Sequence, residues 1–231
     1  MNERMKENQI SPAEAIALQK KMREDLRIEP LDRPIKTIAG ADVSLERFGA
    51  DLYAGIIVLS YPDLRPIDHA VAKVRADFPY IPGLLSFREI PGLLECLAKL
   101  RTRPDLIVVD GQGIAHPRRL GIAAHLGLVA DIPTIGSAKS RLFGAFPEGA
   151  SLPEKAGDAA PLVDPRTGEP VGHAFKSKAR SNPIIVSPGH RVSLEQSLDL
   201  ARNCIRGYRL PEPTRLAHLL VNAFRKGEIS E

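Results

Sequence analysis

Apolar residues that alternate with polar or small ones predict a group of β-strands in the first half of the chain. We expect strands at residues 36–45, 51–60 and 67–75, where the pattern has the two-residue period of a strand. Short turns at 47–49 and 61–63 separate them. Because strands joined by short turns pair with their chain neighbours, the pattern predicts an antiparallel three-strand meander.

The most informative strand is expected at 106–109, a run of four branched aliphatic residues. Such a run is too short for a helix and rich in β-branched residues, which is typical of a strand buried on both faces. The run ends at Asp110, and Gly111-Gln112-Gly113 follows. Ligands of open α/β sheets bind beyond the carboxyl ends of strands. Asp110 is therefore either part of a functional site or the cap of the next turn or helix.

Helical periodicity and capping signals predict the remaining elements. Helices are expected at 11–26, 86–100, 119–126, from 193 onward, and at 213–226 before Gly227. Both 11–14 and 193–196 have the pattern of a capping box, and Pro91 is a point where the second helix could kink or restart. Further strands are expected at 133–138, 171–176 and 183–187, whereas 148–169, rich in glycine and proline, is expected to be irregular. Without repeats or a clear boundary, 1–231 is predicted to be a single domain.

Composition narrows the class of protein. A chain of 231 residues, 43% of them hydrophobic, can bury a substantial core. The sequence contains no apolar run of 18 residues, the length that would predict a membrane span. The charged segment 1–7 is not followed by the hydrophobic stretch that is typical of a secretory signal. Cys96 and Cys204 lack metal-ligand spacing, so we expect a reducing, cytoplasmic location. The net charge of +4 is a mild indication of a polyanionic partner.

Two nucleotide-binding motifs are excluded or absent. A dinucleotide fingerprint would need a glycine where His116 stands, and no P-loop pattern occurs in the sequence.

The predicted element order, β-β-β-α-β-α-β-α, brings three carboxylates within reach of one another. If the first and fourth strands are neighbours, Asp42 and Asp110 stand side by side, and Glu89 could reach them from the first turn of its helix. Hard oxygen ligands suit Mg²⁺ or Mn²⁺ rather than zinc. Two such ions about 3.5–4 Å apart can activate water and stabilise the leaving oxygen in phosphodiester cleavage. Asp42 could instead be a buried structural aspartate held by backbone amides.

Six motifs, spread over about residues 19–218, resemble those of endonuclease V, the deoxyinosine-directed repair nuclease. They are Ala-Gly-Ala-Asp42-Val-Ser, Phe-Pro-Tyr80-Ile-Pro-Gly, Leu-Ser-Phe-Arg-Glu89, Val-Asp110-Gly-Gln-Gly-Ile-Ala-His-Pro-Arg, Gly-Ser-Ala-Lys139-Ser-Arg-Leu and Ser-Pro-Gly-His190. The resemblance implies an α/β fold of the ribonuclease-H-like kind, in which helices flank a mixed sheet of the meander plus parallel strands. It also implies a metal-dependent enzyme that nicks the second phosphodiester bond 3′ to deoxyinosine, leaving 3′-hydroxyl and 5′-phosphate ends.

The resemblance further implies roles for individual residues. Asp42 and Asp110 would bind Mg²⁺, for which Mn²⁺ could substitute, with Glu89 as a further ligand and Lys139 as a catalytic residue. Tyr80 would act as a wedge in the base stack. Residues expected to contact DNA or the lesion are Pro79, Tyr80, Ile81, Pro82, Gly83, Leu85, Gly111, Gly113, His116, Gly121, Gly136, Ser137 and Leu142.

His218 matches the position at which the last helix of the family contributes an acidic residue or histidine to the metal site. Helical periodicity argues differently, because His218 lies almost opposite the apolar stripe of that helix and would be a surface histidine. The stripe comprises Leu216, Leu219, Leu220, Ala223 and Phe224. His218 can therefore be a ligand only if this helix packs across the site by its polar face.

Several alternatives remain open at this level. Tyr80 could cover an edge of the core, and His116 could be a structural hydrogen-bonding residue. Six basic residues are candidates for phosphate contacts or for ordinary surface charges: Arg118, Arg119, Arg141, Lys176, Lys178 and Arg180. For function, the alternatives to a deoxyinosine nuclease are an inosine-specific endoribonuclease of the same fold and a lesion-binding module without catalysis.

Overall fold

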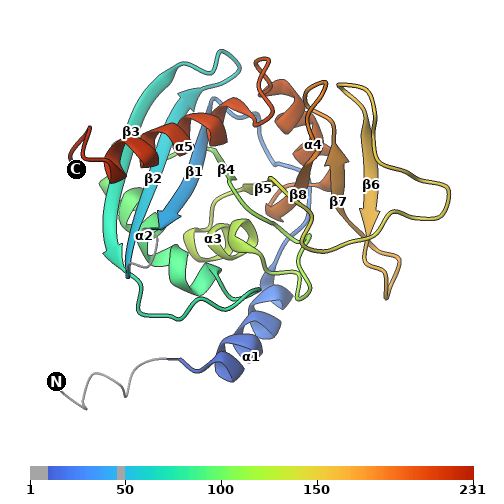
Figure 1. Ribbon diagram of the computed structural model, residues 1–231, viewed down its shortest axis with the longest axis horizontal. Coiled ribbons are helices and arrows are strands. Elements are labelled where there is room, and N and C mark those ends of the chain that lie inside the picture. Colours follow the sequence, from blue (N-terminus) through green and yellow to red (C-terminus); the bar gives the residue numbers. More distant parts are fainter. Residues whose placement is uncertain (1–9, 46–49) are drawn as a thin grey trace.

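The computed structural model describes residues 10–45 and 50–231, whose strands form one mixed sheet between helices (Figure 1). The strands are β1 (Thr37–Leu45), β2 (Asp51–Ser60), β3 (Pro66–Arg75), β4 (Leu106–Val109), β5 (Thr134–Ala138), β6 (Ala159–Val163), β7 (Pro170–Phe175) and β8 (Ile184–His190). The helices are α1 (Pro12–Met22), α2 (Ser86–Lys99), α3 (Ile122–Ala130), α4 (Leu194–Asn203) and α5 (Glu212–Arg225), and a 3-10 turn, η2 (Arg23–Asp25), follows α1. None of these helices has the length and apolar character needed to cross a membrane.

The strand order is β3-β2-β1-β4-β5-β8-β7-β6. The antiparallel meander of β1, β2 and β3 is confirmed, and β4 runs parallel to both β1 and β5. Ala41 on β1 pairs with Val109 on β4, so the residues that follow them, Asp42 and Asp110, lie at the same edge of the sheet, as predicted. The predicted turn at 47–49 and the segment 1–7 lie outside the described residues.

Each face of the sheet is covered by its own pair of helices. On one face, Ile107 and Val109 of β4 pack in a core to which α2 and α3 contribute. On the other face, Leu106 and Val108 pack in a core with residues of α4. The predicted burial of β4 on both faces is confirmed, because alternate side chains of a strand point to opposite faces.

The last helix, α5, crosses β1 and β2 (Figure 1), and the residues that it buries fully are not its large apolar ones. Its buried residues are Pro213, Thr214, Ala217 and Val221. Two glycines of the sheet make the close approach possible. A Cβ on Gly40 would lie 1.8 Å from the carbonyl oxygen of Pro213, and one on Gly55 would lie 2.6 Å from Val221 Cγ2. Of the predicted stripe, Leu219 is exposed and the other four residues are half-buried, so the stripe is not the fully buried face of the helix.

Four further details differ from the sequence-based expectation. Strand β6 lies inside the segment expected to be irregular; it contains Pro161 but is the outermost strand of the sheet, where a missing backbone N–H is tolerated. Helix α3 begins after Gly121, since Arg119 has a left-handed backbone (φ 59°) that a helix cannot continue through. Pro91 lies within an unbroken α2. The capping box at Ser11 is complete, whereas Gln196 does not reciprocate the cap of Ser193 and instead accepts a hydrogen bond from the backbone of Leu31.

Candidate metal centre and adjoining cavity

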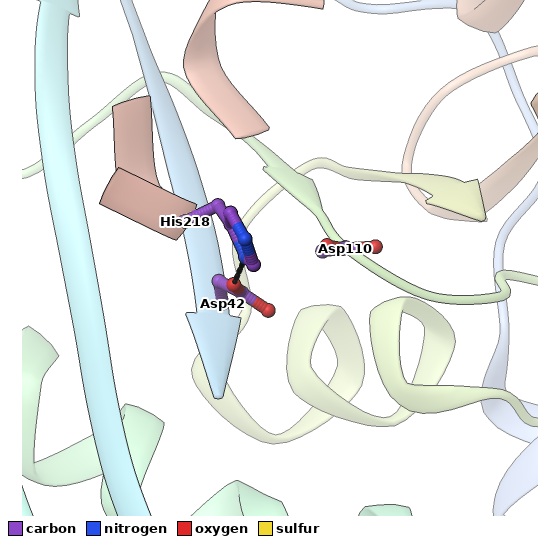
Figure 2. A group of neighbouring side chains, drawn as sticks. All are labelled: Asp42, Asp110 and His218. Atoms are coloured by element: carbon purple, nitrogen blue, oxygen red, sulfur yellow. Dashed lines mark hydrogen bonds and ion pairs between the residues drawn. The ribbon is translucent and has the colours of Figure 1, made fainter. Parts of the chain in front are cut away.

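Three side chains from three elements meet at the edge of the sheet (Figure 2). Asp42 comes from β1, Asp110 follows β4, and His218 comes from α5, with one potential ligand atom of each residue lying within 4.8 Å of the others. The Asp110 amide donates to the carbonyl of Ala41 at 2.9 Å, which extends the β1–β4 pairing to the cluster itself. The sheet register and the close packing of α5 together build this group.

His218 is bound on both of its ring nitrogens. Its Nδ1 lies 2.8 Å from Asp42 Oδ2, and its Nε2 lies 3.0 Å from Asn222 Nδ2. The Asp42 carboxylate and the Asn222 amide thus hold the ring between them, with Nδ1 as the nitrogen turned toward Asp42. His218 therefore faces the carboxylates while its side chain stays 44% exposed. The helix presents this histidine because the small residues beside it, not the large apolar ones, are the buried face.

Negative charge accumulates around this cluster. Burial raises the pKa of Asp42, and the neighbouring Asp110 adds to the shift. Burial also raises the pKa of Glu89 to about 7, with Asp42 and Asp110 contributing, although Glu89 is not one of the three clustered residues. Lys139 forms an ion pair with Asp110 Oδ2. A site with more buried anionic groups than cations is one that a further cation would stabilise.

The donor set tests whether these residues suit a metal ion. Two carboxylates and one imidazole offer two hard oxygen atoms and one nitrogen within coordinating reach of a common point. Carboxylates suit Mg²⁺ and Mn²⁺, and imidazole extends the choice to later divalent ions. The cluster thus fits a divalent cation.

A cavity of about 210 Å³ adjoins the cluster and shares Asp110 with it. This is smaller than the roughly 300–1,000 Å³ of sites for drug-sized ligands, so it suits a single planar ring. Its lining includes these residues of the sequence analysis: Gly83, Leu85, Glu89, Asp110, Gly111, His116, Gly121 and Leu142.

The other expected contact residues lie outside this lining. Gly113, Gly136 and Ser137 are buried behind it, and a Cβ on Gly136 would come within 2.3 Å of the Gly113 nitrogen. Tyr80 is 62% exposed, and Pro79 and Pro82 beside it are exposed too.

Gln112 is a cavity residue that the sequence analysis did not single out. Its Nε2 donates to the carbonyl of Ser140 at 2.8 Å, but Oε1 is buried without a hydrogen-bond partner among the described residues. A buried unpaired acceptor costs free energy unless a ligand or water supplies a donor. The sequence feature that could have identified Gln112 is its position between two glycines directly after Asp110.

The carbonyl of Gly83 joins the Tyr80 loop to the rest of the site. It accepts hydrogen bonds from Gln19 Nε2 at 3.0 Å, Arg118 Nη2 at 2.7 Å and His116 Nε2 at 3.1 Å. Gln19 comes from α1, is fully buried, and also accepts from Arg118 Nε. We call Gln19, His116 and Arg118 the Gly83 clamp. In this structure the Arg118 guanidinium is thus engaged inside the protein.

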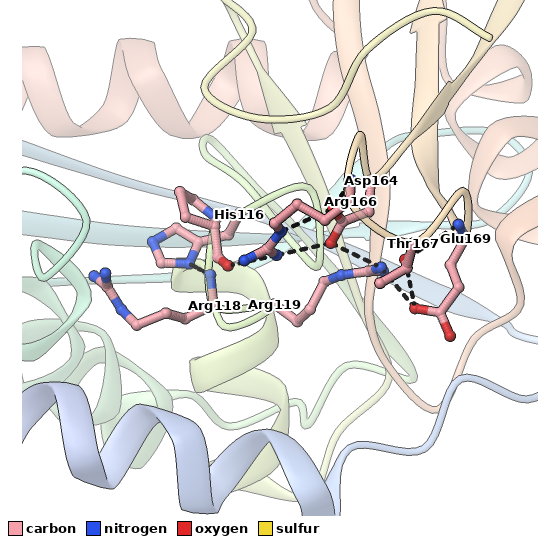
Figure 3. A network of polar contacts seen from close by, with 8 residues as sticks. His116, Arg118, Arg119, Asp164, Arg166, Thr167 and Glu169 are labelled. Atoms are coloured by element: carbon pink, nitrogen blue, oxygen red, sulfur yellow. Dashed lines mark hydrogen bonds and ion pairs between the residues drawn. The ribbon is translucent and has the colours of Figure 1, made fainter.

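Arg119 is likewise held internally (Figure 3). It forms ion pairs with Asp164 at 3.3 Å and Glu169 at 2.9 Å, and Arg166 binds both Asp164 and the carbonyl of Pro117. The Arg166 hydrogen bond holds the pKa of Asp164 well below its usual range. These contacts fix the turn after β6 against the segment that carries His116.

A buried histidine under the cavity gives a pH-dependent prediction. His125 Nδ1 lies 2.9 Å from the hydroxyl of Ser86, and burial lowers the pKa of His125 from 6.5 to about 4. The unfolded chain therefore takes up a proton first, so this contribution to stability is complete above about pH 6.5 and is lost as the pH falls toward 4. The corresponding contribution to stability is on the order of a few kcal/mol. Unfolding measured by denaturant should lose less stability over this range in His125→Gln than in wild type, whereas His69→Gln, at an exposed histidine, should match wild type. If the stability of His125→Gln and of wild type fell equally steeply with decreasing pH, the prediction would be wrong.

Comparison with known proteins gives a consistent result. The family model described as Endonuclease V matches residues 17–219. The chain is 48% identical over 211 residues to an endonuclease V of Nostoc punctiforme, covering 91% of this chain and 93% of that protein. It resembles the crystal structure of endonuclease V from Streptomyces avermitilis with a TM-score of 0.86 and 35% identity, over 96% of each chain. It also resembles Ciona intestinalis endonuclease V, solved in complex with a 23mer DNA containing an inosine followed by a ribo-adenosine, with a TM-score of 0.80 and 26% identity over 95% and 100% of the two chains.

Proposed function

The chain belongs to the endonuclease V family and is a nuclease that hydrolyses phosphodiester bonds, and we propose that its substrate is inosine-containing DNA. The observation that carries this proposal is that a cavity suited to one base shares Asp110 with the metal cluster. A base extruded from the stack into this cavity would leave its own strand beside the carboxylates. We further propose that the nick falls at the second phosphodiester bond 3′ to the lesion and leaves 3′-hydroxyl and 5′-phosphate ends.

We assign recognition of the inosine base to the residues that line the cavity. Hypoxanthine carries a ring N–H that adenine lacks, and Gln112, which lines the cavity, has a buried Oε1 without a partner among the described residues; a rotation of this side chain would bring that acceptor to the ring N–H. Leu85, Ile122 and Leu142 supply apolar surface around the ring. A wall of few polar groups among apolar ones is the usual construction of a selective small-ligand site.

We propose Asp42, Asp110 and His218 as the residues that hold Mg²⁺, with Mn²⁺ able to substitute and with Glu89, which lines the adjoining cavity, as a further ligand. A bound divalent cation supplies Lewis acidity and lowers the pKa of its water. Asp42 and Asp110 would orient the cation at the sheet edge, and Lys139 would hold a phosphate oxygen beside Asp110. A single catalytic domain and a cytoplasmic location complete the proposal; both cysteines are free thiols, as is usual in reducing compartments.

One nicking assay tests the proposed function. Duplexes that differ only in inosine or adenosine at one position, in DNA and in RNA, are incubated with Mg²⁺, with Mn²⁺ and with chelator. We expect metal-dependent nicking of inosine DNA at one position, with little cutting of undamaged DNA. Preferential cutting of inosine RNA would favour the endoribonuclease, and binding without nicking in any metal would favour a lesion-binding module.

Replacing Tyr80 tests its role as a wedge. The ring is exposed on a rigid, proline-flanked loop and can stack where the extruded base has left. Tyr80→Phe should be mild, whereas Tyr80→Ala should weaken lesion binding by about fivefold to over a hundredfold, since base–aromatic stacking is worth about 1–3 kcal/mol. Single-turnover nicking of bound substrate should change much less. If Tyr80→Ala bound the lesion as well as wild type, Tyr80 would only cover an edge of the core. If both variants lost the same affinity, the hydroxyl rather than the ring would make the contact.

Gln19 gives a separate test of loop positioning. Gln19→Leu removes the hydrogen bonds of Gln19 with Gly83, Leu120 and Arg118 while keeping similar volume, and leaves the Arg118 guanidinium with one partner fewer. We expect a loss of about 1–3 kcal/mol in stability, the cost of a buried unpaired polar group, together with weaker inosine discrimination. Combining Gln19→Leu with Tyr80→Ala should cost little further discrimination, because both act through one loop. Fully additive losses in lesion binding would contradict this coupling.

A further inference from the structure

Two turns beside Lys139, which the proposed chemistry does not use, contain many cationic residues. The turn at 176–182 precedes β8 and the turn at 206–211 precedes α5. Over 176–182 and 206–215 the sequence has six cationic residues and one acidic residue: Lys176, Lys178, Arg180, Arg206, Arg209, Arg215 and Glu212. Lys178 and Arg180 are exposed and have no ion pair among the described residues. Such an excess of positive charge suits a phosphate backbone.

Tyr208 provides an aromatic ring in the middle of this charge. The ring is 51% exposed. The Arg215 guanidinium lies 4.3 Å from its centroid and Lys178 Nζ lies 6.0 Å from it. Arg215 is itself fixed by Glu212, to which its Nε donates at 2.8 Å. An ordered aromatic ring among cations is the arrangement by which proteins bind unstacked nucleotides.

Hydrogen bonds join the two turns to each other and to Lys139, the residue that follows β5. The Arg209 side chain donates to the carbonyls of Asn182 and Pro183 and to the backbone carbonyl of Lys139, and Ser177 Oγ donates to the carbonyl of Arg209. Lys139 is the residue whose side chain pairs with Asp110. Because Arg209 holds its turn against the backbone of Lys139, the neighbouring Tyr208 lies on the turn that a DNA strand passing Lys139 would meet.

We propose that Tyr208, with Lys178 and Arg215, is a stacking platform for one base of the DNA strand that passes Lys139, an assignment that rests on the proposed function. The ring receives the base face, Arg215 holds the ring in place, and Lys178 contacts the adjoining phosphate. The platform is distinct from the Tyr80 loop, which is tied to the cavity through the carbonyl of Gly83. It would add affinity on the cleaved strand without reading the inosine.

The test measures equilibrium binding without divalent metal, so that the DNA is not cut. Wild type, Tyr208→Phe and Tyr208→Ala are compared on inosine duplexes in which one abasic nucleotide is moved stepwise along the cleaved strand. Tyr208→Ala should bind about fivefold to over a hundredfold more weakly and Tyr208→Phe nearly normally, as expected for stacking. At one abasic position the difference between wild type and Tyr208→Ala should disappear. Lys178→Gln should reduce the log–log salt slope by about 0.7–0.9.

Two outcomes would overturn the platform. Wild-type affinity in Tyr208→Ala would remove the ring from binding, and a deficit that is the same at every abasic position would exclude stacking on a particular base. Thermal unfolding of each variant identifies any loss that comes from folding, and Tyr208→Phe is the matched control. If wild type shows no preference for inosine, the proposed function fails instead, and the same variants on undamaged single-stranded DNA still test the platform.

Discussion

Asp110→Asn and Asp42→Asn are each expected to abolish detectable nicking while leaving lesion binding largely intact. Both carboxylates belong to the cluster proposed to hold the cation, whereas the lesion would be held by the cavity and its loops. A catalytic metal contributes several kcal/mol to the transition state, and each factor of ten in rate is about 1.4 kcal/mol. The loss in single-turnover rate should thus be at least about a thousandfold. Asp199→Asn, at an exposed carboxylate on α4, should nick at the wild-type rate.

Thermal unfolding separates a lost metal ligand from a damaged fold. Burial and Asp110 raise the pKa of Asp42, so its negative charge is unfavourable in the metal-free protein. Metal-free Asp42→Asn should therefore unfold at or above the wild-type temperature. Added Mn²⁺ should raise the wild-type unfolding temperature, because a ligand of the native state stabilises it, and should raise that of the variant much less. Wild-type nicking by either aspartate variant would refute the metal assignment.

The adjacency of Asp42 and Asp110 could be predicted because strand pairing follows from local patterns. Four consecutive branched residues identified β4, and the short turns identified the meander. Once β1 and β4 are parallel neighbours, Asp42 within β1 lies beside Asp110, the residue that follows β4. Family resemblance added Lys139 and Tyr80, whose roles no periodicity indicates.

His218 was misjudged from periodicity because the rule weighs large apolar side chains. Helix α5 packs by small residues against Gly40 and Gly55. Such close backbone contact depends on the absence of large side chains on the helix and of Cβ atoms on the sheet. The strand β6 was missed for a related reason, since Pro161 disqualifies a central strand but not an edge strand. Both errors concern the place of an element in the fold rather than its own sequence.

Only His116 of the Gly83 clamp could be expected from the sequence to be a structural hydrogen-bonding residue; Gln19 could not. Gln19 is a polar residue of an N-terminal helix, and its partners are 64 and 101 positions away in the chain. Its complete burial is set by tertiary packing. The same holds for Arg118 and Arg119, which look like phosphate contacts in the sequence but bind Gly83, Asp164 and Glu169 in the structure.

Lys139→Ala is expected to slow single-turnover nicking by about a hundred- to a thousandfold, the usual effect of removing one group that stabilises developing charge. Unlike a ligand variant, it should not weaken metal binding. The Lys139 ammonium pairs with Asp110 and opposes the raised pKa of Asp42, so removing it takes a positive charge from the site and leaves more room for the charge of a divalent cation. Titration with Mn²⁺, followed by unfolding temperature, should give equal or tighter binding in Lys139→Ala than in wild type. Lys139→Arg keeps the charge and should lose less activity than Lys139→Ala. If Lys139→Ala instead bound Mn²⁺ as weakly as Asp110→Asn, the lysine would act by organising the metal cluster and not by holding the phosphate.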